Sequence, residues 1–156
     1  MTLTYLPFDA ATVASLRAGG PDAYGNPAER LISDGHDNPC RSCLRNIPEG
    51  TEMLIGAARP FATLQPYAET GPIFLCADAC TPNDGVTFPP VLATSPDYLA
   101  KAYDRNDRII YGTGQVTPSD QIAEYATALF ERDAVAYVDV RSARNNCFLT
   151  RIVQTS

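Results

Sequence analysis

The sequence predicts an α+β fold, with one compact domain over residues 1–156, a mostly antiparallel sheet and two or three helices. Short β-rich runs alternate with turns rich in proline and glycine along most of the chain. The segment 122–130 has the apolar spacing of an amphipathic helix. A chain of 156 residues, 45% of them hydrophobic, can bury a core without covalent cross-links.

The N-terminal part begins with a short β-rich run, residues 2–8, that we interpret as the opening strand. Asp9 then offers an N-cap for a helix, because its carboxylate can accept hydrogen bonds from the first free N–H groups. Val13 and Leu16 have helical spacing, and Gly19-Gly20 ends the helix. The residues from there to the first cysteine contain Asp-Gly and Asn-Pro pairs, so we expect loops.

A β-hairpin is predicted in the middle of the chain. Residues 52–58 and 72–76 are apolar and β-rich, and we expect them to pair. The proline-containing segment 59–71 joins them, and loops of this length commonly carry function. Residues 81–90 form a second connector rich in proline and glycine.

Two helices are predicted in the second half of the chain. Ser95-Pro96 favours the start of a short helix through Ala102, because proline is well tolerated at the first helical position. The clearer helix has Thr117 as its N-cap and Pro118 at its first position. Its buried face is predicted to comprise Ile122, Tyr125, Ala126, Leu129 and Phe130.

Three more strands are predicted in this half. Residues 108–116 have strand character, and the runs 134–140 and 147–153 flank a turn. Asp139 and Arg141 project to the same side of their strand, and we interpret them as a solvated pair. Cys147, at the start of the last strand, is predicted to be a core residue.

The charge balance argues against a nucleic-acid partner. The chain has 12 Lys and Arg against 18 Asp and Glu, a formal charge of −6, so phosphate backbones would repel it. The N-terminus lacks the basic and apolar regions of a signal peptide, and no apolar run is long enough to span a membrane. We therefore expect a cytoplasmic protein whose five cysteines stay reduced.

Two cysteine pairs, Cys40/Cys43 and Cys76/Cys80, flank the predicted hairpin. A Cys-x-x-Cys turn places two sulfurs correctly for a metal, and one helical turn would put the second pair on one face. Because an antiparallel hairpin returns to the end where it starts, we expect the two pairs to meet. Four thiolates complete a tetrahedron, so they predict a closed, structural zinc site.

Three alternatives to this zinc site stay open. His36, the only histidine, could replace one cysteine, or the thiols could be buried core residues without a metal. A reversible Cys40–Cys43 disulfide is the third alternative. The motif also departs from a typical zinc knuckle, since Leu44 follows Cys43 where glycine is usual.

The 59–71 loop carries the best candidate for a small-molecule site, which comprises Arg59, Tyr67 and Glu69 together with Arg41. A guanidinium can bind a carboxylate through two hydrogen bonds, and tyrosine adds a hydroxyl and an apolar face. The zinc site is expected to fix this loop to the body, with Arg41 donating a hydrogen bond to a thiolate. The alternative is a surface loop whose Arg–Glu pair adds little stability.

A set of short motifs in a fixed order extends from about Asn38 to the C-terminus. The motifs are Asn38-Pro39-Cys40-Arg41, residues 50–54, Pro66-Tyr67-Ala68, Gly71-Pro72-Ile73-Phe74, residues 134–138, Asn146-Cys147-Phe148 and Arg151-Ile152-Val153. In order and spacing, they resemble the bacterial family catalogued as domain of unknown function 1203.

This resemblance implies a single cytoplasmic domain and brings no established reaction. Many members share the residues that match Cys40-Arg41 but lack a cysteine at the position of Cys43, which would restrict a zinc site to a subgroup. Many also have histidines at the positions of Asp139 and Arg141, so histidine chemistry does not transfer to this chain.

Two functional hypotheses follow from the sequence. The first is a non-enzymatic binding domain in which zinc on the four cysteines stabilises a binding loop. The second is a thiol-dependent enzyme or redox sensor that uses Cys40, with Arg41 lowering its pKa and His36 or Glu69 as the base. The sequence names no ligand and no reaction for either of them.

Overall fold

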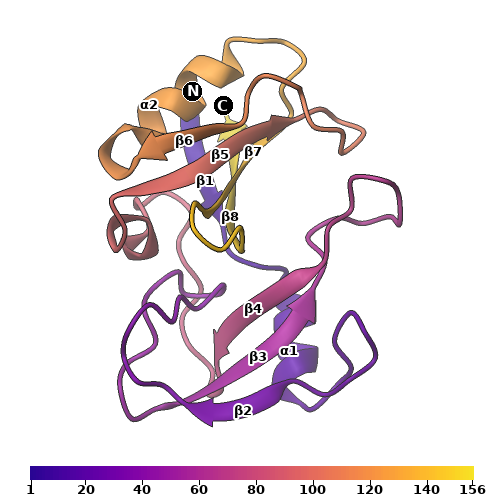
Figure 1. Cartoon of the computed structure of the whole chain (residues 1–156), viewed down its shortest axis with the longest axis vertical. Coiled ribbons are helices and arrows are strands. Elements are labelled where there is room, and N and C mark those ends of the chain that lie inside the picture. The colour runs from indigo at the N-terminus through magenta and orange to yellow at the C-terminus, as the bar shows by residue number, and fades with distance from the viewer.

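Two antiparallel sheets form the body of the protein, which the computed structural model describes over residues 1–156. Figure 1 shows the larger sheet above the smaller one along the long axis. Strands contain 34% of the residues and helices 15%, so the single compact domain is α+β with mainly β-structure. The larger sheet has the strand order β1 (Thr2–Leu6), β8 (Phe148–Thr155), β7 (Tyr137–Ser142), β5 (Asp97–Tyr103), β6 (Gln115–Pro118). The smaller sheet has the order β2 (Glu29–Ile32), β3 (Glu52–Ala58), β4 (Gly71–Cys76).

Helix α1 (Ala10–Arg17) packs against the smaller sheet. Asp9 caps it as predicted, because its carboxylate accepts a hydrogen bond from the backbone N–H of Thr12 at 2.9 Å. The buried residues Val13 and Leu16 share one apolar cluster with side chains of β3 and β4. The helix ends before Gly19, whose φ of +85° suits a glycine.

Helix α2 (Ile122–Phe130) packs against the larger sheet with its predicted apolar face. The predicted N-cap at Thr117 is wrong, because Thr117 and Pro118 are the last residues of β6. Thr117 donates its side-chain hydrogen bond to the carbonyl of Gln115 instead of capping a helix. A 3-10 turn over Ser119–Gln121 separates the strand from the helix.

The helix predicted from Ser95 to Ala102 is also wrong, because this segment enters strand β5. β5 pairs with β6 on one side and with β7 on the other, so it lies inside the larger sheet. Four consecutive residues, 100–103, are buried. Hydrogen bonding and burial on both sides outweigh the local helix signal of the Ser-Pro pair.

Two strands differ from the prediction, one in its start and one in its existence. Within residues 108–116, Ile109 makes only an isolated bridge to Tyr103, and regular pairing begins with β6 at Gln115. Strand β2 was predicted as a loop, and all four of its residues are exposed at the edge of the smaller sheet. An edge strand with no buried face lacks the alternating pattern that marks strands.

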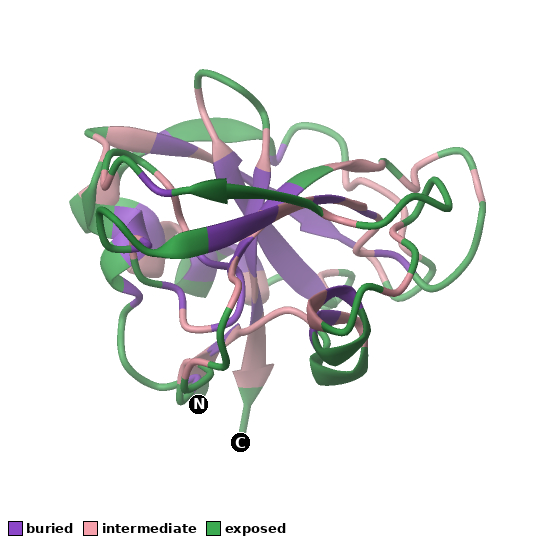
Figure 2. Cartoon of the chain, turned by 90° about the horizontal axis from the view of Figure 1, so that it is seen from below, coloured by how far each residue is buried: buried purple, intermediate pink, exposed green.

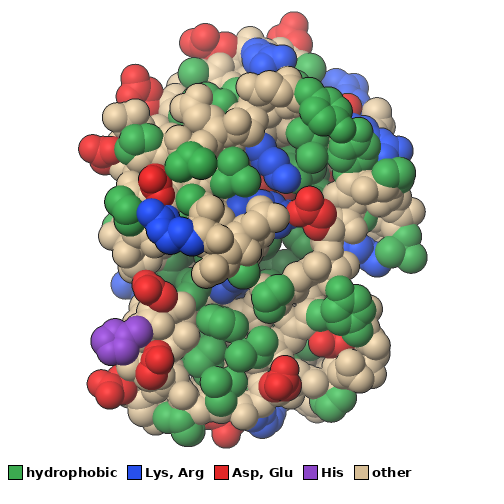
Figure 3. Space-filling view, viewed as in Figure 1, with side chains coloured by type: hydrophobic (Ala, Val, Ile, Leu, Met, Phe, Trp, Pro, Cys, Tyr) green, Lys and Arg blue, Asp and Glu red, His purple; other side chains and the backbone are tan.

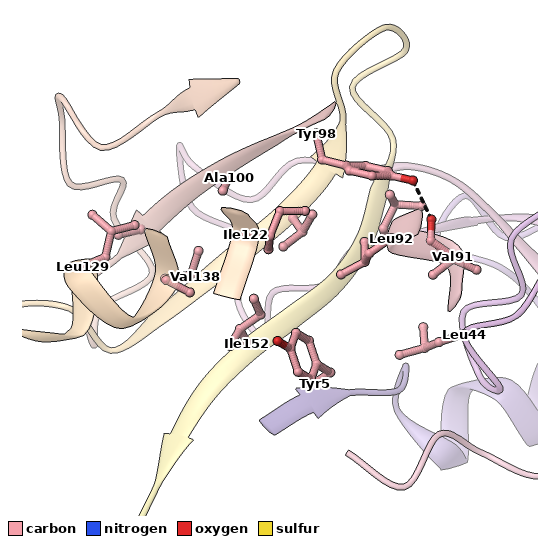
Figure 4. Packing of buried hydrophobic residues seen from close by; sticks show 14 residues of the cluster. Tyr5, Leu44, Val91, Leu92, Tyr98, Ala100, Ile122, Leu129, Val138 and Ile152 are labelled. Atoms are coloured by element: carbon pink, nitrogen blue, oxygen red, sulfur yellow. Dashed lines mark hydrogen bonds between the residues drawn. The ribbon is translucent and has the colours of Figure 1, made fainter. Parts of the chain in front are cut away.

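Apolar side chains form separate clusters in the two sheets. The larger cluster lies between α2 and the five-stranded sheet, and Figure 4 shows Tyr98 within it, donating a hydrogen bond to the carbonyl of Val91. Leu44, which follows the first cysteine pair, belongs to this cluster. Figure 2 shows the buried residues along the central strands and the exposed ones mostly in peripheral loops. None of the helices is long and apolar enough to cross a membrane.

The cap of α1 gives a test of the fold. Asp9→Ala should lower the free energy of unfolding by about 1 kcal/mol, because it removes the acceptor for the first free N–H groups of the helix. Urea denaturation measures the change. Asp9→Asn retains an acceptor and is the matched control, and equal stability of the two variants would contradict the capping role.

Candidate metal centre

The first cysteine pair lies in a tight knuckle that precedes β3. The backbone N–H of Cys40 donates to the carbonyl of Arg45, and the N–H of Leu44 donates to the carbonyl of Cys40, both at 2.9 Å. Leu44 has a φ of +55°, the left-handed conformation that glycine adopts in a typical knuckle. A leucine pays a conformational cost there, which its complete burial in the larger apolar cluster offsets.

The second pair lies at the end of β4, on the same side of the hairpin as the first pair. Cys76 is the last residue of β4, and Cys80 follows in an irregular segment rather than in the predicted helical turn. The N–H of Cys76 points at the sulfur of Cys40, with an N–S distance of 3.4 Å. Cys40 also forms a parallel bridge with Phe74, so the knuckle is aligned directly beside β4.

The four sulfurs form one compact group. The Sγ atoms of Cys40, Cys43, Cys76 and Cys80 all lie within 4.8 Å of one another, and Cys40 and Cys80 are 3.8 Å apart. Four thiolates around zinc, with bonds near 2.3 Å, place neighbouring sulfurs about 3.8 Å apart. The predicted meeting of the two pairs is therefore confirmed, and the donor set fits a metal ion.

An arginine contacts this group, but it is not the predicted one. Arg17, at the end of α1, donates to Cys80 Sγ at 3.1 Å and to the carbonyl of Cys76. Arg41 donates instead to the carbonyls of Phe148 and Pro39, and burial lowers its pKa to about 10. Arg17 could not be linked to the site from sequence, because it lies 63 residues from Cys80.

The pKa values of Cys40, Cys43 and Cys76 are shifted in different directions. A hydrogen bond from the thiol of Cys43, supported by the N–H of Cys76, lowers the pKa of Cys40 to about 4. The same contact raises the pKa of Cys43, while burial and the charge of Cys40 raise the pKa of Cys76 to about 12. A divalent cation would supply the charge that allows all four sulfurs to ionise.

His36 and the fifth cysteine, Cys147, are not part of the sulfur group. His36 is exposed in a turn closed by a hydrogen bond to Asp34, and Figure 3 shows the only histidine on the surface. Cys147 is half-buried rather than in the core, and its thiol lies 3.7 Å from the carbonyl of Asn145.

The four predicted ligand-binding residues lie in different places. Arg41 and Arg59 line separate cavities, and Glu69 lines a third. Tyr67 shares a hydrogen bond of 2.8 Å with the hydroxyl of Tyr111. A common ligand site for Arg41, Arg59, Tyr67 and Glu69 stays a prediction.

The 59–71 loop contacts the larger sheet. Phe61 packs against Tyr103 and Tyr137, and the carbonyl of Pro60 accepts a hydrogen bond from Arg151 at 2.8 Å. The loop begins where Ala58 pairs with Gly71, at the opposite end of the hairpin from the cysteines. Any effect of a metal on the loop would therefore pass through β3 and β4.

The prediction of a solvated Asp139/Arg141 pair is wrong. Asp139 is completely buried and makes two hydrogen bonds to Arg151, of 2.7 and 3.0 Å. Arg141 is only 4% exposed and faces Glu69 of the 59–71 loop, with 3.1 Å between Nη2 and Oε2. Glu69 and Phe61 of the 59–71 loop, together with Arg151, cover the face of β7 that alternation alone would assign to solvent, so its charges are buried.

Comparison with known proteins supports the resemblance of the motifs. The profile of the family described as "Protein of unknown function (DUF1203)" matches residues 37–154. The chain belongs to this family. No curated protein and no solved structure gives a significant match. In this DUF1203 protein the match includes all four cysteines, whereas α1 with Arg17 lies outside it.

The contact of Arg17 with Cys80 can be tested by metal affinity. Arg17→Ala should weaken metal binding about tenfold, because a hydrogen bond that orients and neutralises a ligand is lost. Competition with a chromophoric chelator measures the affinity. Arg132→Ala removes the same charge from an exposed site and should leave the affinity unchanged. Equal affinities of the two variants would show that Arg17 does not support the centre.

Proposed function

We propose that this protein is a small binding domain of the bacterial cytoplasm, stabilised by one structural zinc ion on Cys40, Cys43, Cys76 and Cys80. The observation that carries the proposal is the grouping of four sulfurs within 4.8 Å. An all-thiolate donor set favours zinc over harder cations, which prefer oxygen ligands. The net charge of −6 makes a small molecule a better ligand than nucleic acid.

A structural role is favoured because four thiolates leave no open position for water or substrate. Cys40 has no exposed surface, which also argues against a reacting ligand. The metal would join the knuckle to the end of β4 and so close the base of the β3–β4 hairpin. Through that hairpin it would limit the freedom of the 59–71 loop at the other end.

A thiol-dependent enzyme or sensor is the second candidate, because the pKa of Cys40 is lowered to about 4. A reactive thiolate also needs access and a base. Cys40 is fully buried, Arg41 donates to backbone carbonyls, and His36 lies outside the sulfur group. These observations favour the structural metal.

Metal content tests the first candidate directly. Protein purified in reducing buffer after growth with zinc should contain about one zinc per chain, measured by mass spectrometry of the metal. Cys43→Ser should lose the zinc and melt at a lower temperature, whereas Cys147→Ser should keep both properties. Metal-free protein whose melting temperature does not change with a chelator would overturn the proposal.

Alkylation distinguishes the two candidates. Zinc-bound thiolates should resist iodoacetamide until a chelator is added, because their lone pairs are used in metal bonds. Peptide mass spectrometry would then show the four clustered cysteines modified only after chelation. Selective modification of Cys40 in untreated protein would instead support the thiol enzyme or sensor.

A further inference from the structure

A cavity of about 300 Å³ opens between the 59–71 loop and the turn that joins β7 to β8. A volume of this size suits a small organic molecule. Figure 3 shows Lys and Arg side chains gathered beside the hollow between the upper and lower parts of the molecule. The polar residues of the cavity lining are Glu69, Thr70, Arg141, Asn145 and Asn146.

Arg141 lines this cavity, and its guanidinium is incompletely hydrogen-bonded. Its Nη1 donates to the carbonyl of Asn146 at 3.1 Å. Its Nε and Nη2 are buried and have no hydrogen-bond partner, although Nη2 lies 3.1 Å from the carboxylate of Glu69 in an ion pair. Nε and Nη2 form the edge of a guanidinium that can donate one hydrogen bond to each oxygen of a carboxylate. A buried donor without a partner is costly, which indicates a missing acceptor.

The charges around Arg141 are not balanced. Lys101, Arg141 and Arg151 form a cluster with only two carboxylates, those of Asp139 and Glu69. Asp139 accepts its two hydrogen bonds from Arg151, and the ion pairs of Lys101 and Arg141 are both with Glu69, although the charge of Asp139 also acts on them. Lys101 Nζ lies 3.9 Å from that carboxylate, and burial lowers its pKa. An excess of buried positive charge in a protein of net charge −6 favours an anion at this place.

Glu69 is more exposed than the two cations with which it pairs. Its side chain is 44% exposed, whereas the side chains of Arg141 and Lys101 are 5% and 11% exposed. It comes from the 59–71 loop, so it can turn toward solvent without a change in either sheet. Its carboxylate therefore holds a position beside Arg141 that another carboxylate could take.

We infer that the cavity binds a small molecule through its carboxylate, which pairs with Nε and Nη2 of Arg141 and displaces Glu69, with Lys101 as the second cation. Asn145 and Asn146, on the opposite side, supply polar groups to the rest of the molecule. The planar pair of donors matches a carboxylate better than a tetrahedral anion. This inference deepens the proposed function and rests on its binding part, not on the zinc.

The test compares Glu69→Gln with Glu131→Gln, which removes the same charge from an exposed site. Propionate and succinate are titrated into each protein at constant ionic strength and followed by calorimetry and by two-dimensional amide NMR. Glu69→Gln should bind them about tenfold more tightly, because the competing internal carboxylate is gone. The amide signals of Asn145 and Asn146 should shift with saturation.

Arg141→Lys should lose this binding, since lysine retains the charge but lacks the paired donors. If Arg141→Lys fails to fold, the comparison of the two glutamate variants still decides. Equal affinity of those variants for propionate would overturn the inference, and so would inorganic phosphate that binds as tightly. Zinc content is measured on every sample, so zinc-loaded protein that binds no carboxylate refutes the inference alone.

Discussion

The antiparallel pairing of β3 with β4 is the constraint on which the metal centre depends. Met53 lies opposite Cys76, so the end of β4 returns to the level at which β3 begins. The knuckle precedes β3 and aligns with β4 through Cys40 and Phe74. Backbone pairing therefore holds the two cysteine pairs at the same end of the hairpin. A site assembled in this way loses less conformational entropy when it binds its ion.

The same hairpin connects the sulfur group with the cavity beside Arg141. The sulfur group lies at one end, and the loop at the other end reaches the larger sheet through Phe61 and Glu69. That contact covers Asp139 and Arg141, and it creates the cavity beside them. One supersecondary element thus carries the sulfur group at its base and one wall of the cavity at its tip.

The cysteine group could be predicted from the sequence because it needs only local signals and one strand pairing. Cys-x-x-Cys, two β-rich runs and a joining loop are enough to bring four thiols together. Segment 97–103 could not be predicted in this way. It is a strand because it pairs with β6 and β7, and the local Ser95-Pro96 signal gives no information about that pairing. Local preference decides little in a strand with neighbours on both sides.

The charged cluster could not be predicted for a related reason. Alternation along β7 places Asp139 and Arg141 on one face, and a single sequence gives no sign that distant residues cover this face. Glu69 and Arg151 approach it from other parts of the chain. Arg17 likewise meets Cys80 only after α1 has packed on the smaller sheet. Contacts between distant segments, rather than composition, determine which charges are buried.

Leu44 couples the stability of the smaller sheet to that of the larger one. Its backbone belongs to the cysteine knuckle, while its side chain packs with Tyr5, Val91 and Ile152 in the larger cluster. Melting of the smaller sheet would pull this side chain out of its neighbours and leave a void among them. We therefore expect the two halves to unfold together in a single transition.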